Sequence, residues 1–472
     1  MNNFIPLGRN PLSFLASFLV SCLVLSLLLS LLVTCQLQKE RFSSDTSIQL
    51  RFSADSLVFD TLFTDNISIS KRLKIYNDDK NGVVIKKIEL SQPDSPFRLT
   101  INGKEGTSFN DVQLLGKDSS LILVKAFINS RDQDLPFIVE DKIHFLTNGN
   151  KQDVFLFSWG QDANYVSDSI LSCSTTWTAA RPYVIFNSML VDSLCTLKIE
   201  PGTRIFSHHG STIYIKGRLQ VNGTASERVV FTNDRFDPAF VNTPGQWEGV
   251  NFLPGSKGNS ISFATIKNAT YGIWLGTPDE DSLADLTVSQ TVIENSASSG
   301  VIAFSSDLTM VNCLIANAGD FVVAGLAGGN YQLLHCTLVN AGTLISQQPT
   351  AGFNDQLQLS DGTFIGEDLL VRIKNSIIWG PSSDELLISS SSQYVVGTDL
   401  FYNLIKSSVD SLTANMNILN EDPLFISADS SQFSLDVLSP AIDAGIDLGV
   451  KRDLLDSLRI PPPDLGAYEF KK

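Results

Sequence analysis

Four acidic side chains in one short segment are of the type that can bind a hard cation. These are Asp279, Glu280, Asp281 and Asp285. Carboxylate oxygens at short spacing are suitable calcium ligands. The segment lacks the Asp-x-Asp-x-Asp-Gly order of a specific calcium loop, so a solvated acidic loop is the favoured interpretation. Calcium is kept only as an alternative, and no other cofactor or metal is expected.

The four histidines offer no recognisable catalytic arrangement. Only His208 and His209, which precede Gly210, have the sequence surroundings of an exposed site. Neighbouring residues on a strand face opposite sides, so these two imidazoles cannot simply share one metal ion. No Ser-His-Asp or zinc-ligand spacing accompanies them. We therefore assign no catalytic residue and no metal ligand.

Aromatic side chains suggest a binding function instead, because sugar rings stack on exposed indole and phenol faces. Trp247, Tyr271 and Trp274 are the candidate contacts for a glycan, and Trp177 and Tyr331 lie in the same part of the chain. Most aromatic residues in a large core are buried. The glycan hypothesis therefore requires at least two of them on one exposed face.

A repeated unit must position these side chains. Asparagine closes a short apolar run four times, at Asn268, Asn295, Asn317 and Asn340. The differences between these numbers are 27, 22 and 23 residues, and the longest spacing contains the acidic segment. Short strands at such a period indicate a solenoid, in which each coil can bury its face only against its neighbours.

Stacked coils would place equivalent residues above one another, at one strand spacing of roughly 4.8 Å. Two inward columns follow, which are Ile266, Ile293, Ile315 and Leu338, and Ala264, Thr291, Cys313 and Cys336. The asparagine amides at the bend are expected to bond to the coils above and below. In this structural ladder, Asn317 would lie between the amides of Asn295 and Asn340.

The segment from about Trp177 to Leu387 resembles a right-handed parallel β-helix of the pectate-lyase-like superfamily. The resemblance rests on the asparagine columns, Gln246-Trp247-Glu248-Gly249 and Asn375-Ser376-Ile377-Ile378-Trp379. Three closing segments are similar to the C-terminal segment of many bacterial β-helix surface proteins: Asp422-Pro423-Leu424-Phe425, Ser439-Pro440-Ala441-Ile442-Asp443-Ala444-Gly445 and Asp464-Leu465-Gly466-Ala467-Tyr468-Glu469. The whole layout resembles uncharacterised β-helix lipoproteins of the Gram-negative cell envelope, which implies a fold and a location rather than an activity.

The resemblance also implies a rival function, because enzymes of this superfamily include polysaccharide lyases and hydrolases. Such enzymes usually combine clustered Asp residues that hold calcium with a Lys or Arg base, or use several Asp as acid and base. The column just before the asparagines reads Lys267, Glu294, Ala316, Val339, so it holds one charged pair and then becomes apolar. We interpret Lys267 and Glu294 as an exposed cross-strand pair and lean against an enzyme.

Composition sets outer limits on fold and partners. The chain has 472 residues, of which 43% are apolar and 18% charged, enough for two or three domains with a large core. A formal charge of −16 argues against nucleic acid, and against an anionic membrane surface, as the partner.

The N-terminal region is expected to meet a membrane, because residues 11–34 carry no charge. Leu32-Val33-Thr34-Cys35 resembles a lipobox, although threonine departs from the usual Gly, Ala or Ser before the cysteine. Leu19-Val20-Ser21-Cys22 fits the pattern better locally but would leave an apolar mature N-terminus. An uncleaved membrane helix is the third alternative, since about 20 apolar residues can span a bilayer. We expect lipidation at Cys35.

The remaining cysteines do not form a disulfide framework. Cys313 and Cys336 fall in one inward column and are interpreted as buried thiols. Cys173 and Cys195 can form a disulfide in an oxidising compartment, but their spacing leaves open whether they meet.

Alternating short runs between residues 47 and 159 predict a different fold for the N-terminal part. Seven or eight such strands, separated by Asn-Asp-Asp, Asn-Gly and Thr-Asn-Gly turns, indicate an immunoglobulin-like antiparallel sandwich. The expected all-β organisation is a signal peptide with lipobox or membrane anchor (1–35), a β-sandwich (36–159), a linker or cap (160–182), a right-handed parallel β-helix (183–437) and a C-terminal capping segment (438–472).

The sequence thus predicts a lipoprotein of the cell envelope, anchored to the outer membrane and either periplasmic or surface-exposed. The expected role is a structural or binding scaffold, whose partner is a polysaccharide or another envelope protein. The alternative is a polysaccharide lyase or glycoside hydrolase of the pectate-lyase-like superfamily.

Overall fold

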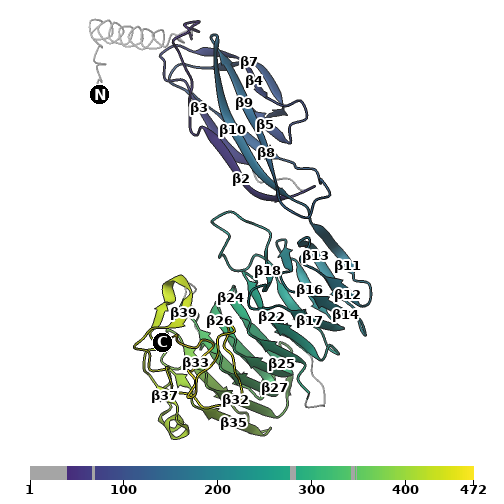
Figure 1. The fold of residues 1–472 in the computed structure, drawn as a ribbon, viewed down its shortest axis with the longest axis vertical. Coiled ribbons are helices and arrows are strands. Elements are labelled where there is room, and N and C mark those ends of the chain that lie inside the picture. The colour runs from purple at the N-terminus through teal and green to yellow at the C-terminus, as the bar shows by residue number, and fades with distance from the viewer. Residues whose placement is uncertain (1–39, 66–69, 277–282, 342–345, 347, 472) are drawn as a thin grey trace, which may run out of the picture. The chain divides into compact units, whose positions relative to one another are not determined.

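The computed structural model describes residues 40–471 apart from 66–69, 277–282, 342–345 and 347 (Figure 1). Two compact units divide the described chain. The first comprises 40–59, 67–127 and 139–158, and the second comprises 60–66, 128–138 and the chain from Trp159 onward. No helix among the described residues is long and apolar enough to cross a membrane.

The N-terminal strands form two antiparallel sheets, which confirms the predicted sandwich. One sheet has the order β1 (Arg51–Phe52), β3 (Lys71–Tyr76), β8 (Ser119–Ala126), β5 (Phe97–Ile101), β6 (Lys104–Gly106). The other has the order β2 (Ser56–Phe63), β10 (Asn150–Gln161), β9 (Phe137–Thr147), β4 (Val83–Leu90), β7 (Ser108–Leu114). Alternate residues on each strand face inward, as Leu73 and Ile75 of β3 do, because successive side chains point to opposite faces.

The second unit is built on a long sheet of parallel strands, which confirms the predicted parallel β-helix. Its first coils contain β11 (Asn164–Ile170), β12 (Thr175–Trp177), β13 (Tyr183–Val191), β14 (Thr196–Ile199), β15 (Arg204–Ser207), β16 (Thr212–Ile215), β17 (Arg218–Asn222), β18 (Val229–Asn233), β19 (Gly249–Phe252), β20 (Asn259–Ser262), β21 (Ala264–Lys267), β22 (Ile273–Leu275), β23 (Leu286–Ser289) and β24 (Val292–Ser296). Its later coils contain β25 (Val301–Val311), β26 (Leu314–Ala318), β27 (Val323–Leu334), β28 (Thr337–Val339), β29 (Ala351–Asn354), β32 (Leu369–Lys374), β33 (Ile377–Trp379), β34 (Leu386–Ser389), β35 (Val396–Phe401), β36 (Leu404–Ile405) and β37 (Ile418–Leu419).

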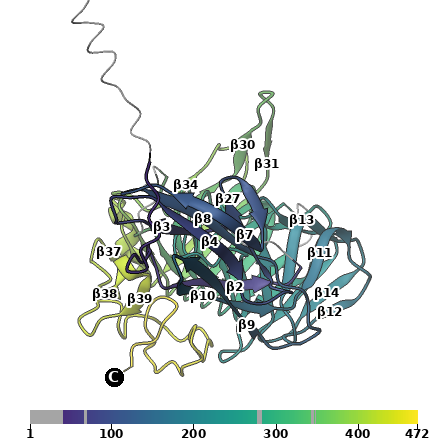
Figure 2. The same cartoon turned by 90° about the horizontal axis from the view of Figure 1, so that it is seen from above.

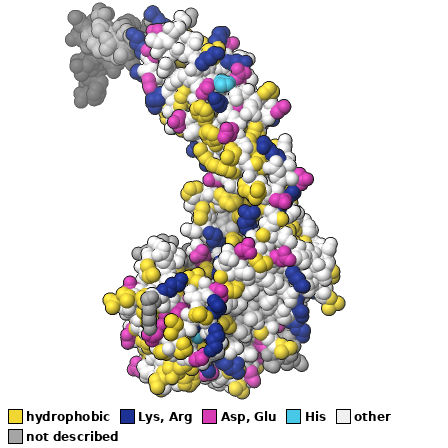
Figure 3. Space-filling model, viewed as in Figure 1, with side chains coloured by type: hydrophobic (Ala, Val, Ile, Leu, Met, Phe, Trp, Pro, Cys, Tyr) yellow, Lys and Arg dark blue, Asp and Glu magenta, His cyan; other side chains and the backbone are white. Residues whose placement is uncertain are grey.

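Each middle coil contributes three short strands that pair with the strands three places further along the chain. Thus β19 pairs with β22, β20 with β23 and β21 with β24, all in parallel. The strands lie one above another along the solenoid (Figure 1). Outward side chains are aligned by the same stacking, and basic residues form visible columns on the solenoid in the space-filling view (Figure 3).

The observed register is the one that the asparagine spacing predicts. Ile266 pairs with Ile293, Ile293 with Ile315 and Ile315 with Leu338. All four are completely buried, and so are the four residues of the second inward column, Ala264, Thr291, Cys313 and Cys336. The two thiols are free. Apolar contact between coils therefore supplies the core that no single coil could form.

The asparagines lie at the expected bends, and two of their amides bond to the preceding coil, as predicted. Asn268, Asn295 and Asn317 have left-handed backbone, with φ of 64°, 57° and 59°, a conformation that asparagine tolerates better than most residues. Asn268 Nδ2 donates to Asn233 Oδ1 at 2.7 Å, so the amide-to-amide contact joins it to the preceding coil. Asn340 Nδ2 donates to the Ala318 carbonyl oxygen at 3.0 Å.

Asn317 does not bond to the amides of Asn295 and Asn340, which corrects the expected arrangement. Its Nδ2 donates to Ser431 Oγ at 3.3 Å, and its Oδ1 accepts from the Ala341 backbone N–H at 3.3 Å. The physical reason is that a C-terminal segment lies against this bend and supplies a polar partner of its own.

The C-terminal segment covers the outer face of β26, β28 and β33. It contains the hairpin of β38 (Phe425–Ser427) and β39 (Gln432–Leu435), η2 (Ala428–Ser430) and a largely irregular tail, whereas η1 (Asp410–Asn415) precedes β37. Phe433, Leu454 and Ala467 pack in one buried cluster with Leu314, Ala316 and Val339. This explains why the column that starts with Lys267 and Glu294 becomes apolar at Ala316.

The three C-terminal motifs bond to one another and to the solenoid. Ser439 Oγ donates to the Pro423 carbonyl oxygen at 2.5 Å, and Asp464 Oδ1 accepts from the Asp443 backbone N–H at 2.7 Å. Buried Arg459 donates to Asn312 Oδ1 at 2.8 Å and forms an ion pair with Glu469 at 3.2 Å. The three motifs therefore hold the covering segment together, and residues near them attach it to the solenoid.

Two boundaries differ from the expected ones. The parallel sheet starts at Asn164, inside the segment 160–182 that was expected to be a linker, because β11 pairs with β13 in parallel. The last strand of this sheet ends at Leu419, and the covering segment follows it. After β28, β29 joins the parallel sheet, while β30 (Gln356–Gln358) and β31 (Phe364–Gly366) form a hairpin that projects from the solenoid (Figure 2).

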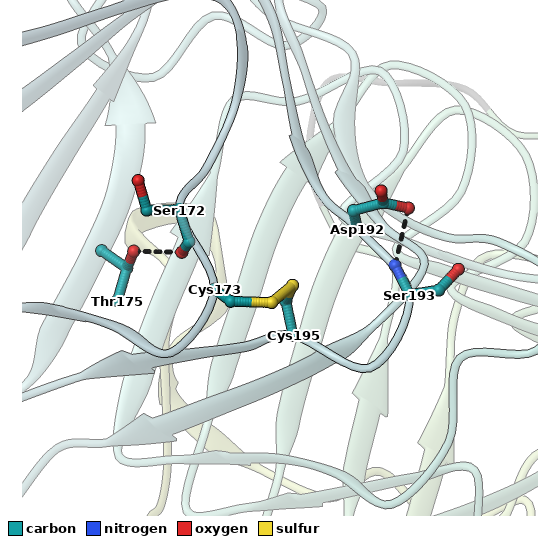
Figure 4. Close-up of a disulfide and its surroundings, with 6 residues drawn as sticks. All are labelled: Ser172, Cys173, Thr175, Asp192, Ser193 and Cys195. Atoms are coloured by element: carbon teal, nitrogen blue, oxygen red, sulfur yellow. Dashed lines mark hydrogen bonds between the residues drawn. A yellow bond between two sulfur atoms is a disulfide. The ribbon is translucent and has the colours of Figure 1, made fainter.

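A disulfide joins the first coils. Cys173 and Cys195 are bonded, with their Cα atoms 4.5 Å apart (Figure 4). The bridge links the turn before β12 to the turn before β14, which are neighbours because β12 pairs with β14. It thus fastens the end of the solenoid, where a coil has a stacking partner on only one side.

Replacing Asn268 should destabilise the solenoid measurably. In Asn268→Ala, Asn233 Oδ1 and the Val241 carbonyl oxygen lose donors that now lie 2.7 and 2.8 Å away. We expect a loss of about 1–3 kcal/mol in the free energy of unfolding, because the buried Asn268 amide gives up both hydrogen bonds and Asn233 Oδ1 keeps only the Thr232 hydroxyl at 3.2 Å. Exposed Asn242 provides the matched control, and Asn242→Ala should cost under about 0.5 kcal/mol. Equal urea midpoints for the two purified variants would contradict the assigned role of Asn268.

Candidate functional site

An open groove of about 190 Å³ lies on the outer surface of three neighbouring strands of the solenoid, β16, β19 and β22. Its side chains are aromatic or polar, and it includes two of the three aromatic residues selected from the sequence. The lining side chains are Thr212, Tyr214, Glu248, Asn251, Tyr271 and Trp274.

Strand alternation explains why these side chains reach the surface. Val250 and Phe252 of β19, and Ile273 and Leu275 of β22, point into the core and are almost completely buried. The residues between them must face outward. In-register pairing aligns Tyr214 with Asn251 and Asn251 with Trp274. The groove floor is therefore one outward column of the solenoid.

The aromatic rings contact one another along this column. Tyr271 and Trp274 meet edge to face, with ring centroids 4.9 Å apart and an interplanar angle of 89°. Trp274 also contacts Phe304 on the next coil, with centroids 5.0 Å apart. Tyr214, Tyr271 and Trp274 are all partly exposed. Their mutual contacts orient the rings while leaving surface accessible to a ligand.

Gly249 is what allows the coil to pass so close to its neighbour at the groove. Its φ is +124°, and a Cβ atom there would lie 1.7 Å from the Tyr271 carbonyl oxygen. Only glycine fits such a backbone approach. The preceding two residues then take opposite directions, with Trp247 in the core and Glu248 in solvent.

The polar side chains of the groove are available to a ligand. Glu248, Asn251, Thr212, Tyr214 and Tyr271 form no side-chain hydrogen bond to any described residue. They provide carboxylate, amide and hydroxyl groups beside aromatic rings. This combination suits the recognition of a polyhydroxylated ligand, whose hydroxyls both donate and accept hydrogen bonds.

The prediction that Trp247 contacts a glycan was wrong, because this side chain is 0% exposed. Its Nε1 donates to the Lys267 carbonyl oxygen at 2.9 Å. Trp177 and Tyr331 are also buried. Tyr214 was missed by sequence reasoning. Tyr214 occupies the same position as Asn251 on the preceding coil. Knowing the coil register before β19 would therefore have identified it.

Of the acidic segment, Asp279, Glu280 and Asp281 lie outside the described residues. Asp285 is buried, and its Oδ2 accepts from the Asp307 backbone N–H at 2.9 Å. Within the part of the chain that the structure describes, no group of three or more His, Cys, Asp or Glu side chains is placed to hold a metal ion.

One further pair was missed by sequence reasoning. His208 Nδ1 lies 2.7 Å from Asp234 Oδ2, and the imidazole packs against Phe186 with centroids 4.8 Å apart. Asp234 follows β18, which stacks on β15, and His208 follows β15. The pair was hidden because its members are 26 residues apart in the sequence. Its geometry is that of an oriented imidazole, a group that can move protons.

Lys267 and Glu294 are cross-strand neighbours, as predicted, but they are not both freely exposed. Burial raises the pKa of the Glu294 carboxyl, and the nearby Lys267 ammonium offsets this rise only in part. Tyr468 of the covering segment lies near this pair. Burial raises the pKa of the Tyr468 hydroxyl to about 12, and the Glu294 carboxylate adds to this rise, whereas Arg228 opposes it. The pair belongs to the covered face, not to the groove.

The family comparison agrees with this geometry. Residues 169–287 match the family described as "Pectate-lyase like beta helix domain". The matched stretch contains β16, β19 and β22 and therefore the whole groove. The solenoid thus contains a pectate-lyase-like β-helix domain. No curated protein matches the chain.

Solved structures resemble the chain only in part. They include the VesB protease of Vibrio cholerae (13% identity, 24% of this chain and 31% of that chain, TM-score 0.18) and a family 123 glycoside hydrolase from Clostridium perfringens (5%, 26% and 30%, TM-score 0.18). A third is the E. coli chaperone DraB (15%, 24% and 55%, TM-score 0.17). The chain spans less than two thirds of each of these three, and at such values the likenesses say nothing about its function.

Glu294→Gln should stabilise the protein at neutral pH but not in acid. Because burial raises the pKa of Glu294 in the folded state, the unfolded carboxyl ionises first as pH rises, and folding stability falls across that window. Glutamine removes this cost. We expect a higher urea midpoint than wild type at pH 7 and no difference below about pH 3, where the carboxyl is protonated in both states. A variant less stable than wild type at pH 7 would contradict this account.

Proposed function

We propose that the protein is a glycan-binding scaffold of the cell envelope, which binds polysaccharide through the groove on β16, β19 and β22. The observation that carries this proposal is the row of partly exposed aromatic rings, Tyr214, Tyr271 and Trp274, next to polar groups that have no side-chain hydrogen bond to another described residue. Folding alone would favour burying these rings. Rings held at the surface of a rigid solenoid suit stacking against sugars.

Two features support an envelope location. The Cys173–Cys195 disulfide is typical of an oxidising compartment. The apolar stretch and both lipobox candidates, Cys35 and Cys22, lie outside the described residues, so the proposed anchor rests on the sequence. In this proposal Cys35 carries lipid and holds the protein on the outer membrane.

A second candidate function is polysaccharide cleavage, and the His208–Asp234 pair favours it. The carboxylate at 2.7 Å orients the imidazole, as a general base requires. Glu248 lies on the next coil, close to the turn that carries His208. Its backbone N–H donates to the carbonyl oxygen of Ser211, three residues after His208, at 2.9 Å. The binding function ranks first because the aromatic row needs no chemistry to explain it.

Trp274→Ala should weaken glycan binding about two- to tenfold, since an aromatic stacking contact is worth roughly 0.5–1.5 kcal/mol. Binding of the purified full-length chain to an array of envelope and plant polysaccharides would be measured, together with the release of new reducing ends. Trp159→Ala is the matched control, because Trp159 is 38% exposed and lies outside the groove.

Three outcomes would count against the scaffold proposal. Equal glycan binding by wild type and Trp274→Ala would show that the groove is not the binding site. An absence of glycan binding altogether would leave an envelope protein as the partner. New reducing ends that disappear in His208→Ala would favour the enzyme.

Cys35→Ser should abolish acyl labelling and leave an unprocessed precursor, or release the protein from membranes, if Cys35 is the lipidated residue. Metabolic labelling with a radioactive fatty acid and membrane fractionation check this. Cys22→Ser is the control. Loss of label in Cys22→Ser alone would move the mature N-terminus to Cys22, and labelling absent from the wild-type chain would favour a membrane helix.

A further inference from the structure

We propose that the groove takes a neutral hexose polymer and discriminates against polyuronates, the polymers that the name of the matched family suggests. This inference rests on the proposed glycan-binding function and specifies its ligand. It follows from the charges and the hydrogen-bonding groups that line the groove.

The charge of the groove is negative. Glu248 is exposed at its edge, and no Lys, Arg or His is among its lining residues. A sugar carboxylate would meet a like charge without a cation to compensate it. Recognition of carboxylates usually relies on Arg or Lys, whose donors match carboxylate geometry. None of the described residues that line the groove carries such a group.

The polar groups match hydroxyls better than they match carboxylates. The Glu248 carboxylate only accepts hydrogen bonds, so it needs a donor such as a sugar hydroxyl. The Asn251 amide and the hydroxyls of Thr212, Tyr214 and Tyr271 can both donate and accept. Every one of these groups can therefore be satisfied by a neutral sugar, whereas a uronate replaces the C6 hydroxyl donor by a carboxylate that only accepts hydrogen bonds.

The charge of the whole chain acts in the same direction. The formal net charge of −16 repels a polyanion at long range. Salt screens this term over roughly 10 Å at 0.1 M. Two measurements can therefore separate the repulsion of a polyanion by Glu248 from its repulsion by the net charge of the chain. One varies the salt concentration, and the other changes a charge far from the groove.

The test uses matched pairs of oligosaccharides that differ only at C6. Hexamers of glucose, mannose and galactose are compared with the hexamers of their uronic acids, in the same linkages, by calorimetric titration of the full-length chain at low and high salt. We expect at least one neutral hexamer to bind and its uronate counterpart to bind at least about fivefold more weakly at low salt, as one like-charge contact at short range implies.

Glu248→Gln should reduce this discrimination several-fold, because it removes the charge but keeps a polar group at the same position. Glu227→Gln is the matched control, since Glu227 is an exposed glutamate of the solenoid outside the groove. It changes the net charge equally and should leave the discrimination as in wild type.

The outcomes separate the two proposals. A uronate hexamer that binds as tightly as its neutral counterpart, with binding lost in Trp274→Ala, would overturn the neutral-sugar inference and leave the glycan-binding function standing. Equal discrimination in wild type and Glu248→Gln would remove Glu248 as its cause and overturn the local argument. Binding of no hexamer, or binding unaffected by Trp274→Ala, would overturn the glycan-binding function, and the inference with it.

Discussion

In-register stacking of parallel coils is the constraint on which the rest of the structure depends. A strand such as β22 is only three residues long and buries two of them, which is too little to fold alone. The coils above and below complete its core through columns such as Ile266, Ile293, Ile315 and Leu338. Because the register is fixed inside, it is also fixed outside, and the groove is a consequence of that alignment.

The bends between strands create a second requirement, because they leave backbone and side-chain polar groups to be satisfied. Asn268 meets it by bonding to Asn233 of the coil before. Further along, Asn312 bonds to the Arg452 carbonyl oxygen at 2.6 Å and Asn375 to the Ile446 carbonyl oxygen at 2.7 Å. The covering segment thus uses the bends of the later coils as attachment points, while Arg459 and Glu469 form a buried ion pair within it.

The sequence was sufficient to predict the features that depend on short-range periodicity. Alternation identified the sandwich strands, and the asparagine spacing identified the inward columns. Contacts between distant segments could not be predicted, since Arg459 and Asn312 are 147 residues apart and no periodicity connects them. The direction of Trp247 was missed for a local reason. Gly249 has a φ of +124°, and regular strand alternation does not extend through such a residue.

The outward column of the groove is less constrained by folding than the inward columns, so its composition reflects another requirement. Along the solenoid this column reads Tyr214, Asn251, Trp274, then Ile302, Ala324 and Gly352. Ala324 and Gly352 are buried, so packing explains the small residues of the later coils, whereas Tyr214, Asn251 and Trp274 are partly exposed. Aromatic and amide side chains occur only at the earlier of these positions, inside the stretch 169–287 that matches the family. Three strands at a spacing of roughly 4.8 Å give a contact about 10 Å long. A groove of that length can hold a short stretch of a polymer, and the strength of its attachment would then depend on how many copies of the protein engage the same polysaccharide.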